Sequence, residues 1–163
     1  MSGLENLNKR LNYRGGNAEG RLLKDKSWSL DKALLYSYQS ATIALQDKEN
    51  PELFTREFRA LINPNKNKPD YDNKILSIQY KDIQLNKDRK GKTSEGKEDT
   101  LIKPGDVFYW KETNTYWIVY LEDIEERAYF RAEIYRCEKE IEINNRKYKV
   151  YYRGPVETTI QWN

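Results

Sequence analysis

Large apolar and polar residues alternate through the last third of the chain, from Asp106 to Arg153. Aromatic and β-branched residues at every second position, separated by short polar turns, are typical of half-buried β-strands. We expect the strands of this region to curl into a small antiparallel barrel or a sandwich. The pattern predicts four of them, at residues 107–110, 116–121, 128–137 and 147–152.

Alternation also occurs in the middle of the chain, although it is less regular there. Residues 39–45 and 54–62 both alternate, and residues 47–51 between them have the composition of a turn, so a β-hairpin is predicted. Residues 63–73 are rich in Asn, Asp and Pro, which predicts a loop. Residues 75–85 return to alternation and predict a further strand.

The first 36 residues follow a different pattern. Residues 1–20 are rich in Asn, Gly and Arg, which predicts an extended arm with a flexible joint at Gly15 and Gly16. From residue 18 to about residue 36 the large apolar side chains fall near one helical face, so a helix is predicted. Ser29 leaves a second interpretation open, in which it caps a new helix and divides this one in two. The residues of the predicted face are Leu22, Leu23, Trp28, Leu30, Leu34 and Leu35.

Together these patterns predict an α+β chain that is mainly an antiparallel β-barrel or sandwich of the small-barrel type, with an N-terminal arm and one or two short helices. We divide it into an arm and helical segment, residues 1–36, and a barrel or sandwich domain, residues 37–163. Residues 86–99 contain five basic and four acidic residues and no large apolar residue. That composition predicts a mobile loop within the second domain.

The composition indicates a modest hydrophobic core. The 163 residues have a mean hydropathy of -1.01, and 13 Tyr and four Trp restore some capacity for burial. The net charge of +3 is carried entirely by residues 1–36, which hold seven basic and four acidic residues, whereas the rest of the chain holds 22 of each sign. This excess is small for a dedicated DNA-binding protein.

The residue types exclude several kinds of catalysis. The chain has no histidine, so Ser–His–Asp and Cys–His nucleophiles and histidine metal sites are excluded. The single cysteine, Cys137, can form neither an internal disulfide nor a thiolate metal cage. We therefore predict no catalytic residue, no cofactor and no metal, and we expect that the protein is not an enzyme. No apolar run approaches the length of a membrane span, so no membrane partner is expected.

Two weaker chemical patterns remain. Gly91-Lys92-Thr93 imitates the end of a phosphate-binding loop, but Asn86 stands where that motif requires its first glycine. The candidates for a metal-dependent hydrolase are the acidic residues Asp70, Asp72, Glu122, Asp123, Glu125 and Glu126. General acid catalysis needs a partly buried carboxyl group, and their polar, turn-like surroundings favour solvated loops instead.

Residues 103–110, 116–119 and 132–137 together resemble a pattern found in neck proteins of tailed bacteriophages. Gly105-Asp106 opens a strand, Trp117-Ile118-Val119 follows a tight turn, and a third strand ends near Cys137. The chain is similar to head-closure or head–tail connector proteins over about residues 103–137, and loosely in the arm at residues 13–17. Head-closure proteins are commonly shorter, and the helix near residues 18–36 has no place in that template.

The resemblance implies a structural virion component, made in the host cytoplasm and located in the neck, that joins the capsid portal to the tail. Its copies would form a homo-oligomeric ring, dodecameric in that family, and DNA would pass through the channel. The implied partners are the portal or an adaptor protein on one side and tail proteins on the other.

Seven basic residues are the candidates for contact with these partners, because positive charge suits either an acidic protein face or passing DNA. A nucleic-acid-binding small-barrel module is the alternative function, since exposed Tyr and Trp beside basic residues stack bases. Against it, the strand region is electrically neutral, and phosphate contacts dominate nucleic-acid affinity. The candidate residues are Lys9, Arg10 and Arg14 in the arm and Lys87, Arg89, Lys90 and Lys92 in the loop.

Overall fold

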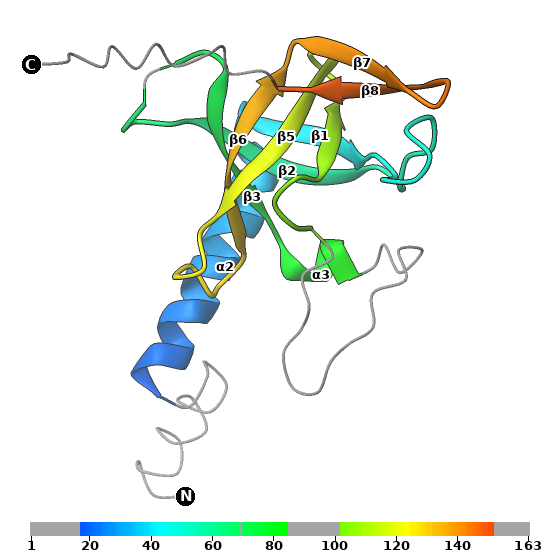
Figure 1. The fold of residues 1–163 in the computed structure, drawn as a ribbon. Coiled ribbons are helices and arrows are strands. Elements are labelled where there is room, and N and C mark those ends of the chain that lie inside the picture. The colour runs from blue at the N-terminus through cyan, green and yellow to red at the C-terminus, as the bar shows by residue number, and fades with distance from the viewer. Residues whose placement is uncertain (1–16, 69, 85–101, 152–163) are drawn as a thin grey trace, which may run out of the picture.

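The computed structural model describes residues 17–68, 70–84 and 102–151. A long helix comes first, a short helix separates two groups of three strands, and a hairpin ends the described chain (Figure 1). In chain order the elements are α2 (Ala18–Tyr36), β1 (Ser40–Leu45), β2 (Phe58–Pro64), β3 (Asn73–Ile78), α3 (Tyr80–Gln84), β4 (Val107–Trp110), β5 (Thr115–Glu122), β6 (Phe130–Cys137), β7 (Lys139–Ile143) and β8 (Arg146–Val150).

The first six strands form a closed barrel in the order β1-β2-β3-β6-β5-β4. It consists of two antiparallel meanders, β1–β3 and β4–β6, which are joined because β3 pairs with β6 and β1 pairs with β4. Closure gives every barrel strand two neighbours and leaves no unpaired edge. The predicted α+β class with a small antiparallel barrel is confirmed, and the sandwich alternative is not what the chain adopts.

The barrel interior is filled by the apolar residues of the alternating pattern. On β6 the inward residues Phe130, Ala132 and Ile134 are each no more than 1% exposed, as the alternation predicts. Phe108 from β4 belongs to the same cluster and is 0% exposed. Ile83 from α3 also joins the cluster, so the short helix covers the lower end of the barrel in Figure 1.

Helix α2 is continuous and has the bounds that its sequence predicts. The side chain of Asn17 accepts a hydrogen bond from the Gly20 amide and so caps the first turn. Ser29 starts no second helix, because its hydroxyl donates to the Asp25 carbonyl within the same helix. The predicted apolar face was too wide, since only Leu30 and Leu34 of its six members are buried.

The strand predicted over residues 75–85 is partly wrong. Strand β3 ends at Ile78, and the chain turns at Gln79 into the helix α3. The buried Gln79 directs this change: its carbonyl accepts from the Asp82 amide, and its side-chain amide donates to the Ser27 carbonyl of α2. Tyr80 and Ile83 are three residues apart, a spacing that fits a helix, which the alternating pattern conceals.

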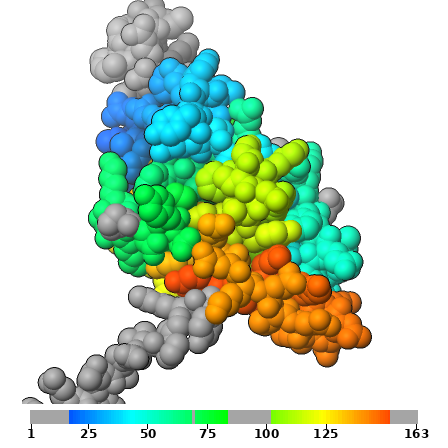
Figure 2. Space-filling model, turned by 90° about the horizontal axis from the view of Figure 1, so that it is seen from above, coloured from blue at the N-terminus to red at the C-terminus, as the bar shows by residue number. Residues whose placement is uncertain are grey.

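The strand predicted over residues 147–152 exists as β8, but its expected place in the barrel is wrong. Within the described residues it pairs only with β7, in a separate two-stranded sheet. Figure 1 shows this hairpin at the opposite end of the molecule from the start of α2, and Figure 2 shows it as a lobe at the side of the barrel. The strand predicted at residues 54–62 begins at Phe58, after an isolated bridge between Gln46 and Phe54.

Candidate interaction surfaces

The hairpin β7–β8 has a two-residue turn that its sequence dictates. Asn144 and Asn145 have φ angles of 51° and 61°, which is the left-handed conformation that a type I′ turn requires. Beyond the turn the strands are in register, with Ile141 opposite Tyr148 and Glu142 opposite Lys147. Because side chains alternate between faces, one face of the hairpin is charged and the other is largely apolar.

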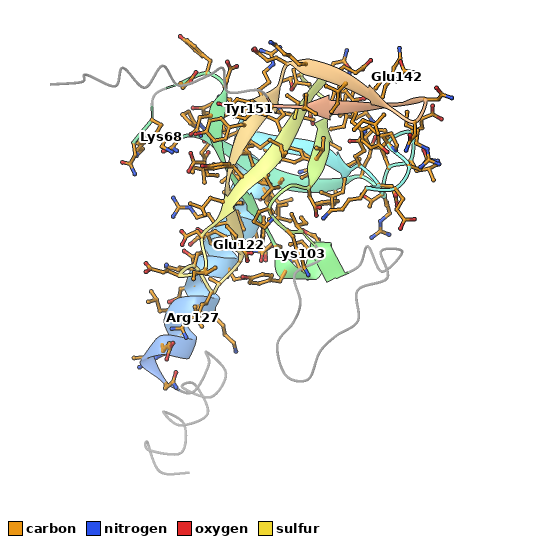
Figure 3. All side chains as sticks on the ribbon, in the orientation of Figure 1. Lys68, Lys103, Glu122, Arg127, Glu142 and Tyr151 are labelled. Carbon is orange, nitrogen blue, oxygen red and sulfur yellow. The ribbon has the colours of Figure 1, made fainter. Side chains whose placement is uncertain are left out.

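Charge is also divided between the two strands of this hairpin. The alternating charged residues of β7 are Glu140 and Glu142, and those of β8 are Lys147 and Lys149. The Glu140 carboxylate lies 2.6 Å from Lys149 Nζ, and the hydrogen bond from Lys149 lowers the pKa of Glu140 below its ordinary value. In Figure 3 Glu142 marks the hairpin, at the top right of the view, and Arg127 marks the region beside α2 at the other end of the molecule.

Three contacts hold the hairpin against the barrel. The Arg146 guanidinium donates a hydrogen bond to the Glu49 carbonyl in the loop between β1 and β2. Lys149 Nζ lies 5.2 Å from the centre of the Tyr116 ring, and Tyr151, directly after β8, stacks on Tyr135 with ring centres 4.6 Å apart. On the apolar face Ile141 and Ile143 remain 45% and 51% exposed. The hairpin is therefore tethered to the barrel but incompletely covered.

A cluster of aromatic side chains lies on the outside of the barrel next to the hairpin. The Tyr109 and Tyr116 rings are 5.2 Å apart, and Phe54 lies 6.1 Å from Tyr109. Phe54 is 41% exposed, and Lys149 places a positive charge beside Tyr116. This aromatic cluster, which consists of Phe54, Tyr109 and Tyr116, is a surface on which a flat group or a partner side chain can pack.

Helix α2 leaves a groove on each side where it lies against the barrel. One groove, of about 950 Å³, is lined by polar and apolar residues of α2, β2, β3 and the loop after β2, among them Asn63 and Asn65. The other, of about 750 Å³, is bordered by Trp28, Leu35 and Tyr36, which are 59%, 67% and 84% exposed. The apolar residues that α2 does not bury against the barrel thus form a second exposed patch.

A buried polar network near the first groove has a structural role. Asn65 Nδ2 donates to Asn73 Oδ1 over 2.7 Å, and Asn73 Nδ2 donates to a Glu133 carboxylate oxygen over 2.7 Å. Partial burial tends to raise the pKa of Glu133, but hydrogen bonds from Lys68 and Asn73 outweigh it and leave the pKa below its ordinary value. The network fixes the loop between β2 and β3 to β6.

Two of the candidate catalytic carboxylates, those of Asp70 and Asp123, accept hydrogen bonds that shape turns. Asp70 Oδ1 accepts from the Asp72 amide, and Asp123 accepts from the Glu125 amide through one oxygen and from Arg131 through the other. Among residues 17–68, 70–84 and 102–151, no group of three or more His, Cys, Asp or Glu side chains is placed to hold a metal ion.

The cysteine is also unsuited to nucleophilic chemistry. Cys137 is buried at the end of β6, and burial raises the pKa of its thiol to about 12. A thiol with such a pKa is almost entirely protonated at neutral pH and reacts slowly. No helix in the described part of the chain is both long enough and apolar enough to cross a membrane.

All seven basic residues that the sequence nominated for partner contacts lie outside the described residues, as does the predicted loop of residues 86–99. Sequence reasoning missed the hairpin as a separate surface. A signal for it exists, because Lys139–Ile143 reads Lys-Glu-Ile-Glu-Ile and Arg146–Val150 reads Arg-Lys-Tyr-Lys-Val around an Asn-Asn turn. The acidic character of the first strand and the basic character of the second can be read from the amino-acid sequence alone.

By its fold the chain is an α+β protein built on a closed six-stranded antiparallel barrel. Comparisons with protein-family models, with curated protein sequences and with solved structures found no match to this chain.

Proposed function

We propose that the chain is a structural component of a tailed-bacteriophage neck, which joins the capsid portal to the tail as a ring of copies. One observation carries the proposal. The barrel is closed and filled, and two incompletely buried amphipathic elements extend from it, α2 at one end and the hairpin β7–β8 at the other (Figure 1). Such a body suits a protein that contacts one neighbour on each side.

The exposed apolar residues support contacts with other proteins. Trp28, Leu35 and Tyr36 lie on or at the end of α2, and Ile141 and Ile143 lie on the hairpin. Aromatic residues are enriched at protein–protein interfaces, and apolar patches of this kind mark interaction sites on soluble proteins. Of the candidate carboxylates, those of Asp70 and Asp123 accept hydrogen bonds within turns, and the thiol of Cys137 is buried at the end of β6.

The direct test is to mix the purified chain with the portal protein encoded by the same genome and to measure the mass of the product by light scattering after gel filtration. The proposal predicts a complex whose mass equals that of the portal ring plus a fixed number of copies of this chain. A chain that stays separate from the portal and from every other virion protein would contradict it.

A charge-neutralised variant sharpens this test. Replacing Lys87, Arg89, Lys90 and Lys92 by Gln should weaken assembly while the circular dichroism of the free chain stays unchanged. The matched control replaces four other exposed cations by Gln, and it should assemble normally. Equal loss in both variants would show that total charge matters rather than this loop. The control positions are Lys66, Lys103, Lys111 and Arg136.

The aromatic cluster supports nucleic-acid binding as a second candidate function. Rings that are partly exposed beside a lysine are the arrangement on which single-stranded bases stack, at about 1–3 kcal/mol per base. Replacing Tyr109 and Tyr116 by Ala should then weaken binding of a single-stranded oligonucleotide, and affinity should fall steeply with salt. An absence of binding at low salt would remove this candidate and leave the neck proposal intact.

A further inference from the structure

We propose that strand β7 of one copy pairs edge to edge with strand β8 of a second copy of this chain, so that copies join head to tail through their hairpins. This inference deepens the proposed function and rests on it in one respect, because it names the contact by which the copies of a ring would meet.

The register shows which main-chain groups are available for such pairing. In a two-residue hairpin the pair next to the turn, Ile143 and Arg146, exchanges main-chain hydrogen bonds, and every second pair does the same. The pairs between them, Glu140 with Lys149 and Glu142 with Lys147, direct their amides and carbonyls outward. Within the described residues, neither strand pairs with any strand but the other.

The charges select the partner edge. The outward-facing positions are acidic on β7 and basic on β8, so pairing of β7 with β7 would place glutamates near glutamates, and β8 with β8 would place lysines near lysines. Only β7 against β8 brings opposite charges together. Opposite charges on neighbouring strands stabilise the pairing, and like charges directly opposite each other destabilise it. The occupant that complements both edges at once is another copy of the same hairpin.

The hairpin also has a physical need for neighbours. A two-stranded sheet by itself is marginally stable in water, whereas three or more strands with an apolar face can be stable. Side-by-side pairing would join the apolar faces of successive hairpins, which carry the half-exposed Ile141 and Ile143. Because each copy offers one acidic edge and one basic edge, the contact is heterologous, and it closes into a ring when the rotation between copies permits.

The test uses two charge-reversed variants of the full chain and sedimentation velocity over a range of concentrations. E140K/E142K makes both strands basic, and K147E/K149E makes both strands acidic. The wild-type chain should self-associate, more weakly as salt rises, and each variant alone should lose at least tenfold in association constant. An equimolar mixture of the two variants should associate again, because each supplies the charge that the other lacks.

Two further variants separate the interface from the fold of the hairpin. The variant with all four reversals keeps every charge pair within the hairpin and should self-associate like the wild type. Glu142→Pro removes an outward amide without removing a hydrogen bond between β7 and β8, and it should abolish association, whereas Glu142→Ala should retain part of it.

A chain that is monomeric at every concentration would overturn the proposal, as would self-association that survives both reversals or that the mixture does not restore. Association that behaves as expected, in a chain that does not bind the portal, would contradict the neck function and leave this interface standing. A chain that binds the portal but never self-associates would contradict the hairpin interface and leave the neck function supported.

Discussion

The barrel and the hairpin β7–β8 are both antiparallel β-structure, but the barrel strands have both edges paired and the hairpin strands, as far as the structure describes the chain, have one. Each barrel strand has a neighbour on both sides, and the side chains inside the barrel, such as Phe130 and Ile134, are 0% exposed. Among the residues that the structure describes, each hairpin strand has one neighbour, and Ile141 and Ile143 are about half exposed. The barrel is complete within one chain, whereas the hairpin can gain further strands.

Local sequence does not account for this difference, because both regions alternate apolar and polar residues and both turn on asparagines with positive φ. Asn114 has a φ of 53° in the barrel turn, close to the values for Asn144 and Asn145. What differs is the pairing between strands that are distant in sequence. It joins β1 to β4, whereas in the described part of the chain β7 and β8 pair with each other alone. Closure therefore makes one region a scaffold and leaves the other available for contacts.

The largest difference in stability is expected when one large apolar side chain is truncated in each region. Phe130→Ala should lower the free energy of unfolding by about 3–5 kcal/mol, because it opens a cavity in a filled barrel. Ile143→Ala should lower it by less than about 0.5 kcal/mol, because the side chain is already half solvated. Urea unfolding followed by tryptophan fluorescence measures both. Similar losses in the two variants would mean that the hairpin is part of the cooperative core.

A backbone substitution tests the turn that leads into β4. Gly105 has a φ of 93°, and although a side chain there would meet no atom within 4 Å, the conformation itself disfavours any residue with a Cβ. Gly105→Ala should cost about 1–2 kcal/mol of global stability. Thermal unfolding would measure it, and Lys103→Ala, two residues earlier, serves as the control with no such strain. An unchanged midpoint for Gly105→Ala would show that the turn relaxes freely.

Acid unfolding should depend on Glu133 in the barrel wall but not on Glu140 in the hairpin. The folded-state pKa of Glu133 lies below its ordinary value, so its contribution is complete above that ordinary value and is lost as the pH falls through the folded pKa. Glu133→Gln should reduce the loss of unfolding free energy that occurs as the pH falls through this pKa. The reduction should be at most about 1 kcal/mol.

Glu140 also has a lowered pKa, because Lys149 donates a hydrogen bond to it. Glu140→Gln should nevertheless leave the acid limb of the global curve unchanged, since the hairpin contributes little to the unfolding of the barrel. Equal flattening in both variants would contradict the separation of the two regions.

The last prediction concerns the junction between the barrel and the hairpin, and it is a reaction rate rather than a stability. Cys137 ends β6 just before β7, and its thiol is buried with a pKa raised to about 12. At pH 8 the native chain should react with a thiol reagent at least about a hundredfold more slowly than the urea-unfolded chain. Rapid labelling of the native chain would show that movement of the hairpin opens the end of the barrel.

Local patterns predicted much of the fold. The bounds of α2 followed from its apolar period, and the inward residues of β6 followed from strict alternation. Alternation failed over residues 75–85, because Gln79 forms hydrogen bonds with distant Ser27 and so favours a turn into α3. A contact between residues 52 positions apart cannot be predicted from the local pattern.

The candidate sites were harder to predict than the fold. Basic residues were chosen by charge alone, and they fall outside the described residues. The hairpin was assigned to the barrel because the type of a strand is a local property, whereas its partner strand is set by the whole topology. The opposite charges of the two hairpin strands are plain in the sequence, but they gain meaning only because these strands pair with each other and not with the barrel.

The most direct test of the contrast is amide hydrogen exchange, resolved by residue, in the dilute free chain and in concentrated or assembled protein. In the free chain, the amides of Phe130, Ala132 and Ile134 should be strongly protected, and those of Glu140, Glu142, Lys147 and Lys149 should exchange quickly. On assembly the four hairpin amides should become protected while the barrel amides stay as they were. Hairpin amides that are already as protected as the barrel in the free chain, or that gain no protection on assembly, would contradict the account.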